Sequence, residues 1–270
     1  MKHKKRRQMS ESWPTVALLT FSGGLQDAYS YCMHGKVFAN AQTGNIVLMS
    51  QCAFYGDLKG VLHYLVPLTA FIFGVFVTEQ IRARYQTLQT VHWRQLVLLG
   101  EIFLLFLAGL FPSSSDLLAN ALVSFACAMQ VQAFRKVNGY AYASTMCIGN
   151  LRSGIEALSA YLRTQDRTLL KKFFHYFGVI GLFALGAGSG AVFGVWLGLH
   201  TIWICCVLLA VGFALMFVKE EMEENPEIQA AWAKIQSDAQ SAETQAKVIG
   251  QTLGREIHQQ ACDLRHPEQK

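Results

Sequence analysis

The sequence predicts an all-α membrane protein with six transmembrane helices, two short broken or re-entrant half-helices and a cytosolic helical tail. Of its 270 residues, 52% are hydrophobic and only 15% are charged, and the mean hydropathy is +0.27. Residues 15–218 contain 12 Lys or Arg and 7 Asp or Glu, too few charges for the surface of a soluble domain. Six apolar stretches approach the length that crosses about 30 Å of hydrocarbon at about 1.5 Å per residue.

The predicted spans follow a basic cytosolic N-terminus at residues 1–14 and fall into two groups of three. They are residues 15–33, 61–81, 95–111, 117–134, 173–199 and 201–218. The first membrane repeat is therefore expected at 15–111 and the second at 116–218. The acidic segment at 219–270 is rich in Ala and Gln, which favours a cytosolic helical tail that is either solvated or binds a partner.

The first span is the least regular of the six. The opening MKHKKRRQ and the apolar run TVALLTF would also suit a secretory signal peptide. However, Gly23, Gly24, Gln26 and Asp27 interrupt the apolar run, and AYSYC is a poor cleavage site. We therefore expect a retained first helix that is broken at its glycines.

The positions of Lys and Arg predict the orientation. Five precede the first span, three lie between the second and third, and seven lie between the fourth and fifth, whereas the opposite loops contain only Lys36 and Lys59. Because cytoplasmic loops carry the excess of basic residues, both termini are expected in the cytoplasm, with the spans in the inner membrane. No nucleic-acid partner is expected, because basic and aromatic residues do not interleave along a polar face.

Two short segments do not fit as full spans. Each has a Gly-Asn pair, at Gly44-Asn45 and Gly149-Asn150, and the apolar part of the first, residues 46–55, has only ten residues. With the predicted orientation they enter from opposite sides and meet near the midplane. Irregular backbone at that depth requires a protein-lined or water-filled cavity, and paired broken segments are typical of secondary transporters. The alternative is that both lie flat at the interface as amphipathic connectors.

The order of span, Gly-Asn segment, span and span recurs, which indicates an inverted 3+3 repeat. The Gly-Asn pairs match at an offset of 105 residues, and AFIFGVF at 70–76 matches GAVFGVW at 190–196 at an offset of 120. In the fifth span, glycines recur at 186, 190, 194 and 198. Small residues in this register predict a seam along which two helices pack closely.

Three runs carry a resemblance to a known family. GGLQDAYSY, HGKVFANAQTGNIV and IGNLRSG closely resemble the YoaK-like family of bacterial multi-pass membrane proteins, whose biochemical function is unassigned. The resemblance covers approximately residues 18–218 and leaves out the acidic tail. It implies a bacterial membrane protein with an uncharacterised activity.

Several polar residues in or near the spans are candidates for a functional or structural role, because inserting an ionisable group at the centre of a span costs about 2.5–3.5 kcal/mol of free energy. Asp27 could bind a cation, relay a proton, form an ion pair or cap a helix. Arg152 could form a surface ion pair or neutralise Asp27 or an anionic substrate. Residues 40–45 could form a tight polar turn or contact a ligand, and Glu101 is expected to pair with Arg94 near the interface. The predicted substrate-binding residues are Gln26, Asp27, Asn40, Gln42, Thr43, Gly44, Asn45, Gly149, Asn150 and Arg152.

The sequence contains none of the common motifs of soluble enzymes, such as a Walker sequence, G-x-S-x-G, H-E-x-x-H or C-x-x-C. We therefore expect neither an enzyme nor a bound metal or cofactor. The predicted function is that of a secondary-type carrier for an unidentified small solute. The alternative is a membrane scaffold without transport activity, whose tail binds a cytosolic partner. Apart from the lipid bilayer and this solute no partner is implied, and homo-oligomerisation is left open.

Overall fold

The computed structural model describes residues 12–86, 93–137, 140–141, 145 and 147–224. The chain divides into two compact units, residues 1–217 and 218–270, and all elements below lie in the first except the end of the last helix. Within the described residues nearly all regular structure is helical, so the predicted all-α class is confirmed.

The helices are α1 Trp13–Met33, α2 Gln42–Phe54, α3 Leu58–Tyr85, α4 Trp93–Ala108, α5 Asp116–Ala133, α6 Cys147–Thr164, α7 Arg167–Leu197 and α8 Ile202–Glu224. Two short 3₁₀ helices, η2 Ser113–Ser115 and η3 Gly198–Thr201, precede α5 and α8. The strands β1 Lys136–Val137 and β2 Tyr140–Ala141 form one antiparallel pair, with Lys136 opposite Ala141.

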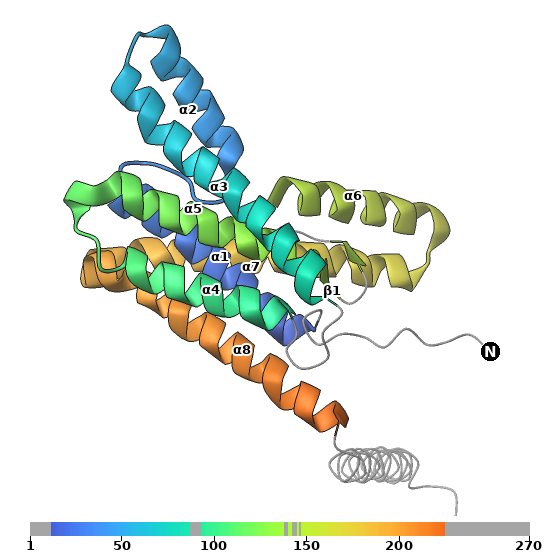
Figure 1. Cartoon of the computed structure of the whole chain (residues 1–270). Coiled ribbons are helices and arrows are strands. Elements are labelled where there is room, and N and C mark those ends of the chain that lie inside the picture. The colour runs from blue at the N-terminus through green and yellow to red at the C-terminus, as the bar shows by residue number, and fades with distance from the viewer. Residues whose placement is uncertain (1–11, 87–92, 138–139, 142–144, 146, 225–270) are drawn as a thin grey trace, which may run out of the picture. The chain divides into compact units, whose positions relative to one another are not determined.

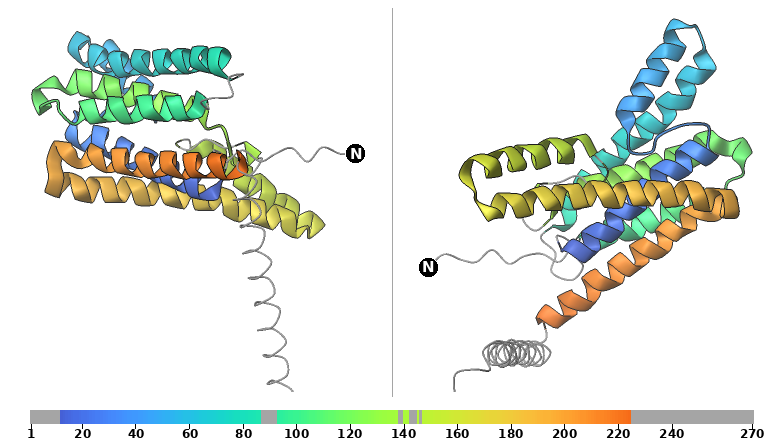
Figure 2. Two further views of the ribbon diagram at one scale, coloured as in Figure 1. Left: turned by 60° about the horizontal axis from the view of Figure 1, so that its bottom comes forward. Right: turned by 180° about the vertical axis from the view of Figure 1, so that it is seen from behind.

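The long helices pack in pairs, and α2 and α6 form hairpins with the long helices that follow them. In Figures 1 and 2, α1 lies along α7, α3 lies along α5, and α4 lies beside α5. The short helix α2 packs on α3, and α6 packs on α7. The two predicted half-helices thus occupy corresponding places in the fold.

Each of these hairpins turns at an aspartate that caps the long helix. The Asp57 carboxylate accepts a hydrogen bond from the backbone N–H of Gly60, and the Asp166 carboxylate accepts one from that of Thr168. An N-cap carboxylate satisfies a backbone donor that has no partner within the helix. The Thr168 hydroxyl and backbone N–H also lower the pKa of Asp166.

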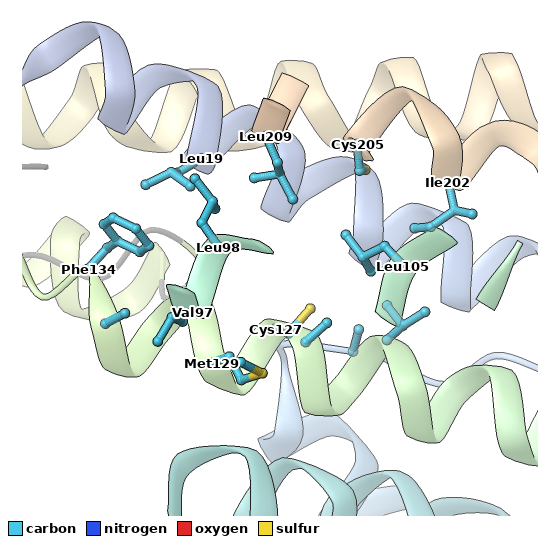
Figure 3. Packing of buried hydrophobic residues seen from close by; sticks show 14 of the residues in the cluster. Leu19, Val97, Leu98, Leu105, Cys127, Met129, Phe134, Ile202, Cys205 and Leu209 are labelled. Atoms are coloured by element: carbon cyan, nitrogen blue, oxygen red, sulfur yellow. The ribbon is translucent and has the colours of Figure 1, made fainter. Parts of the chain in front are cut away.

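The main hydrophobic core lies between α1, α4, α5 and α8. Figure 3 shows Leu19, Leu98, Cys127, Cys205 and Leu209 in this cluster, all with at most 1% of their surface exposed. The spacing of Cys205 and Leu209 places both on one face of α8. This face of α8 therefore covers the core side of α1 and α4.

The expectation that the first helix is broken is wrong, because α1 is continuous through both of its glycines. A Cβ atom on Gly24 would overlap the backbone oxygen of Phe183, and one on Gly23 would lie 2.5 Å from the Thr145 methyl group. The two glycines therefore allow α7 and the segment before α6 to approach α1 closely. Their role is in packing, since missing side chains let helix backbones meet.

The predicted glycine seam on α7 is confirmed, and its partner is α1. A Cβ atom on Gly186 would overlap the backbone oxygen of Phe21, and one on Gly190 would lie 3.0 Å from that of Leu25. Gly198, the last glycine of the series, ends the helix with a φ of +56°. The seam thus holds α1 and α7 at a separation that larger side chains would not allow.

Within the described residues, two stretches are long and apolar enough to cross a membrane, Leu58–Tyr85 and Arg167–Met216, with mean hydropathies of 2.0 and 2.3. The first corresponds to α3, and the second covers α7, η3 and most of α8. Only 11% of the apolar window in α3 is buried inside the protein, which is unlike the core helix of a soluble domain. An apolar surface left uncovered to this extent indicates a membrane protein.

Candidate functional site

A cavity of about 790 Å³ lies where α2 and α6 begin. The starts of the two helices are more than 100 residues apart in the sequence but face one space. The described residues that line the cavity are Asp27, Phe38, Asn40, Ala41, Gln42, Thr43, Phe71, Thr145, Cys147, Ile148, Gly149, Asn150, Ser153 and Phe183. The wall of the cavity is therefore formed by residues of α1, α2, α3, α6 and α7 and of the segments before α2 and α6.

Asp27 connects α1 to the turn before α2. Its side chain is 7% exposed, and Oδ1 accepts a hydrogen bond of 2.7 Å from the backbone N–H of Asn40. The Asn40 amide in turn donates to the backbone oxygen of Gly23 at 3.2 Å. Asp27 thus holds the turn that precedes α2. It is not the cap of that helix, because the N-cap residue Ala41 has no side-chain cap hydrogen bond and Asn40 lies before it.

The polar residues of this turn bind mainly to their own backbone. The buried side chain of Asn45 accepts from the Phe38 N–H at 3.0 Å and donates to the Phe38 oxygen at 2.6 Å. It also donates to the Gln42 side chain, whose amide donates to the backbone oxygen of Ala39 at 2.7 Å. The tight polar turn is therefore formed. The Asn45 side chain makes its hydrogen bonds within this turn and not to the cavity.

The α6 side of the cavity exposes backbone and one unsatisfied hydroxyl group. A Cβ atom added to Gly149 would meet nothing within 4 Å. Thr145, two residues before α6, is 6% exposed, and its hydroxyl has no hydrogen-bond partner. Asn150 is 3% exposed and also lines the cavity.

Six of the ten residues predicted for the site line this cavity. They are Asp27, Asn40, Gln42, Thr43, Gly149 and Asn150. Gly44 and Asn45 lie in the first turn of α2 and are not among the described lining residues. Arg152 is not among the lining residues, because its guanidinium lies in an exposed ion pair with Glu156, with Nε 2.9 Å from Oε1. The structure thus contains the surface ion pair that was one of the two alternatives for Arg152. Arg152 does not neutralise Asp27.

Gln26 does not line the cavity and belongs instead to a buried polar cluster between α1, α4 and α5. Its amide nitrogen donates to Glu101 at 3.2 Å and to Ser22 at 3.1 Å, and its oxygen accepts from the Cys127 thiol at 2.7 Å. Glu101 is fully buried, and its second oxygen has no hydrogen-bond partner. The expected pair with Arg94 near the interface is wrong, since the Arg94 Nε–H donates to the backbone oxygen of Ala133.

Sequence reasoning missed the apolar part of the cavity wall, formed by Phe38, Phe71, Ile148 and Phe183. One signal could have found two of these residues. Phe71 and Phe183 each stand three residues before a glycine that packs against a neighbouring helix, at Gly74 and Gly186. The shared F-x-x-G pattern marks the same face of α3 and α7.

Asp27 is the one lining residue with a formal charge among those described. Within the described residues no group of three or more His, Cys, Asp or Glu could hold a metal ion. The remaining described wall is made of amides, hydroxyls, one thiol, aliphatic groups and phenyl rings. Such a mixture of apolar surface with a few polar groups is typical of a site that binds a small molecule.

One family model matches the chain, over residues 15–215, and its description is protein of unknown function (DUF1275). No curated protein and no solved structure matches. The matched range contains every residue of the cavity wall and ends before the acidic tail. An uncharacterised family is also what the sequence resemblance implied.

Proposed function

The chain belongs to the DUF1275 family of proteins of unknown function, and we propose that it is a secondary-type carrier that moves a small solute across the bacterial inner membrane. The observation that supports this most is the cavity that the starts of α2 and α6 share. Broken helices whose ends meet at a central cavity are typical of secondary transporters, because the helix ends supply unpaired backbone groups to the solute.

In this proposal six helices span the membrane: α1, α3, α4, α5, α7 and α8. Both termini lie in the cytoplasm, as the distribution of Lys and Arg favours. The 13 residues of α2 would extend only about 20 Å, short of about 30 Å of hydrocarbon. α6 has 18 residues, as many as α5, so its length does not exclude a span; but α6 carries Arg152, Glu156 and Arg163 at exposed positions, which a lipid-facing span disfavours. We therefore assign α2 and α6 as re-entrant half-helices that enter from opposite sides.

The packing supports an inverted repeat in which α1 to α4 correspond to α5 to α8. The pair α1 and α7 corresponds to the pair α5 and α3, and each pair packs through a glycine. Gly186 meets the backbone oxygen of Phe21, and a Cβ atom on Gly74 would lie 2.6 Å from that of Phe125. ALLTFSGGLQ at 17–26 matches ALVSFACAMQ at 121–130, at an offset of 104.

These contacts also revise the alignment of the second and fifth spans. The offset of 120 matched Gly74 with Gly194, but a Cβ atom on Gly194 would meet the Met33 side chain rather than a helix backbone. Gly74 and Gly186 make equivalent contacts, which gives an offset of 112 and also matches Phe71 with Phe183.

Solute counterflow in proteoliposomes tests the carrier. The full chain is reconstituted, and exchange is measured for radiolabelled amino acids, organic acids, sugars, nucleosides and polyamines. Gly149→Trp should abolish exchange, because the new side chain fills the cavity from a position with open space around it. Gly188→Trp is the matched control, since Gly188 is exposed on α7, does not line the cavity and also has open space.

Absence of exchange for every solute class by a correctly folded protein would contradict the carrier. That result would favour the alternative, a membrane scaffold whose tail binds a cytosolic partner. The tail from residue 225 onward lies outside the described residues.

A further inference from the structure

The cavity is built from matching parts of the two repeats. Phe71 and Phe183 are related by the offset of 112 residues, and both line the wall. Asn40 and Thr145 are related by the offset of 105 that matches the Gly-Asn pairs, and both line the wall as well. Each half thus contributes a matched phenyl ring, a matched polar side chain and the start of one short helix.

Asp27 is a lining residue without a charged counterpart in the second half. Since Gln26 matches Gln130, the residue that corresponds to Asp27 is Val131, which does not line the cavity. The turn before α2 therefore receives a carboxylate from the chain itself, through the bond from the Asn40 N–H to Asp27. The first turn of α6 contains no acidic residue. A helix start carries unpaired N–H groups and about half a positive charge, so α6 favours an anionic group from elsewhere.

Two buried side chains beside the cavity have polar atoms without partners. The hydroxyl group of Thr145, which is 6% exposed, has no hydrogen-bond partner and can donate to an anion. The amide oxygen of Asn40, which is 4% exposed, has none either and can only accept. Buried polar groups in folded proteins are nearly always paired. Among the described residues with such unpaired buried atoms, Thr145 and Asn40 are the two that line the cavity, where a ligand could reach them.

The two sides of the cavity thus differ in what they can bind. The Asp27 side offers a carboxylate and an unpaired amide oxygen, which together suit a positively charged donor. The α6 side offers a hydroxyl group and the N–H groups of a helix start, which suit a carboxylate. No Lys or Arg is among the described lining residues, so the described wall supplies no cation to Asp27, although its Oδ1 already accepts a hydrogen bond from the Asn40 N–H.

We propose that the cavity binds a small zwitterion, with its ammonium group at Asp27 and Asn40 and its carboxylate at Thr145 and the start of α6. The uncharged part of the ligand lies against Phe71 and Phe183. An α-amino acid has this chemistry. The proposal rests on the proposed carrier function and names its class of substrate.

Binding to the purified full chain in detergent, measured by equilibrium dialysis, tests this. The probes are alanine, leucine and phenylalanine, their amides, which keep the ammonium group alone, and their deaminated acids, which keep the carboxylate alone. At least one amino acid should bind about tenfold more tightly than both of its relatives, because each relative leaves one side of the cavity unpaired.

Two variants test which side of the cavity binds the ammonium group and which side binds the carboxylate. Asp27→Asn should weaken binding of the amino acid about tenfold while the deaminated acid binds at least as well as before, since only the ammonium partner is lost. Thr145→Val should weaken the amino acid and the deaminated acid but not the amide. Thr69→Val is the control for the same change, because the Thr69 hydroxyl is exposed and bonds to its own helix.

Three results would overturn the proposal. Equal binding of the amide would show that no carboxylate site exists at α6, and equal binding of the deaminated acid would show that Asp27 does not bind the ammonium group. No binding of any of these probes would exclude the class. If Gly149→Trp abolishes counterflow of a different solute, the carrier stands and only the zwitterion is wrong.

Discussion

The imidazole of His34 joins the end of α1 to the start of α5, because its Nδ1 lies 2.7 Å from the carboxylate of Asp116. The other ring nitrogen lies 2.9 Å from the Tyr29 hydroxyl group, and the Asn120 amide donates to the His34 backbone oxygen at 2.7 Å. His34 is fully buried. These contacts fix the ends at which the first helices of the two repeats meet.

Replacing His34 with Ala should therefore lower the free energy of unfolding in detergent by about 2 kcal/mol, because Tyr29 and Asp116 both lose a partner. The measurement is denaturant-induced unfolding followed by tryptophan fluorescence. His200→Ala is the control, since His200 is exposed, and it should change stability by less than about 0.5 kcal/mol. Equal effects of the two substitutions would show that the His34 contacts contribute nothing.

Gly190→Leu should destabilise the protein by about 1–3 kcal/mol, because the new side chain would have to occupy space next to the backbone of Leu25 on α1. Thermal unfolding in detergent would detect the change as a lower midpoint. Gly188→Leu lies on the same helix with open space around it, so it should leave the midpoint nearly unchanged. A loss of stability in Gly188→Leu alone would contradict the assignment of the seam.

Gln26→Leu should cost about 1–3 kcal/mol of stability, because it leaves Glu101 without its donor and the Cys127 thiol without its acceptor. Glu101→Gln should be tolerated or stabilising, since a neutral amide is less costly to bury than a carboxylate. Unfolding of both variants in detergent compares them directly. If Glu101→Gln were the more damaging change, the charge of Glu101 would stabilise the protein through a contact other than its hydrogen bond with Gln26.

Single cysteines test the proposed topology in a background without native cysteines. Ser114→Cys and His200→Cys should react with a membrane-impermeant maleimide from outside, and Gln165→Cys should react only after the membrane is opened. All three positions are exposed, so a cysteine that does not react is shielded by the membrane and not by the protein. Outside labelling at residue 165 would contradict the orientation derived from Lys and Arg.

The positions of the helices could be predicted from the sequence, because long apolar runs and small-residue spacing are local signals. The seam of α7 is such a case, since Gly186 and Gly190 lie one turn apart on one face. Gly23 and Gly24 were misread as a break. Their partners, Thr145 and Phe183, are more than 100 residues away, and nothing local distinguishes a hinge from a close approach.

The candidate site could be predicted only where the residues of a single segment themselves indicate a ligand contact. The Gly-Asn segments led to Asn40, Gln42 and Asn150 because a break leaves backbone groups unpaired at that place. Gln26 was grouped with Asp27 through adjacency, yet consecutive residues of a helix point about 100° apart. Helical geometry alone would have separated the core amide from the carboxylate at the cavity.

The helix pairs of this fold interlock the two halves of the chain. α1 of the first half packs on α7 of the second, and α5 of the second packs on α3 of the first. The cavity lies between one body made of α1, α6 and α7 and another that includes α2 and α3. If the cavity opens alternately to the two sides, the bodies that rock against each other are these composites and not the halves of the sequence. A chain cut between residues 111 and 116 could form neither body from one fragment alone, so its two pieces would have to fold by association.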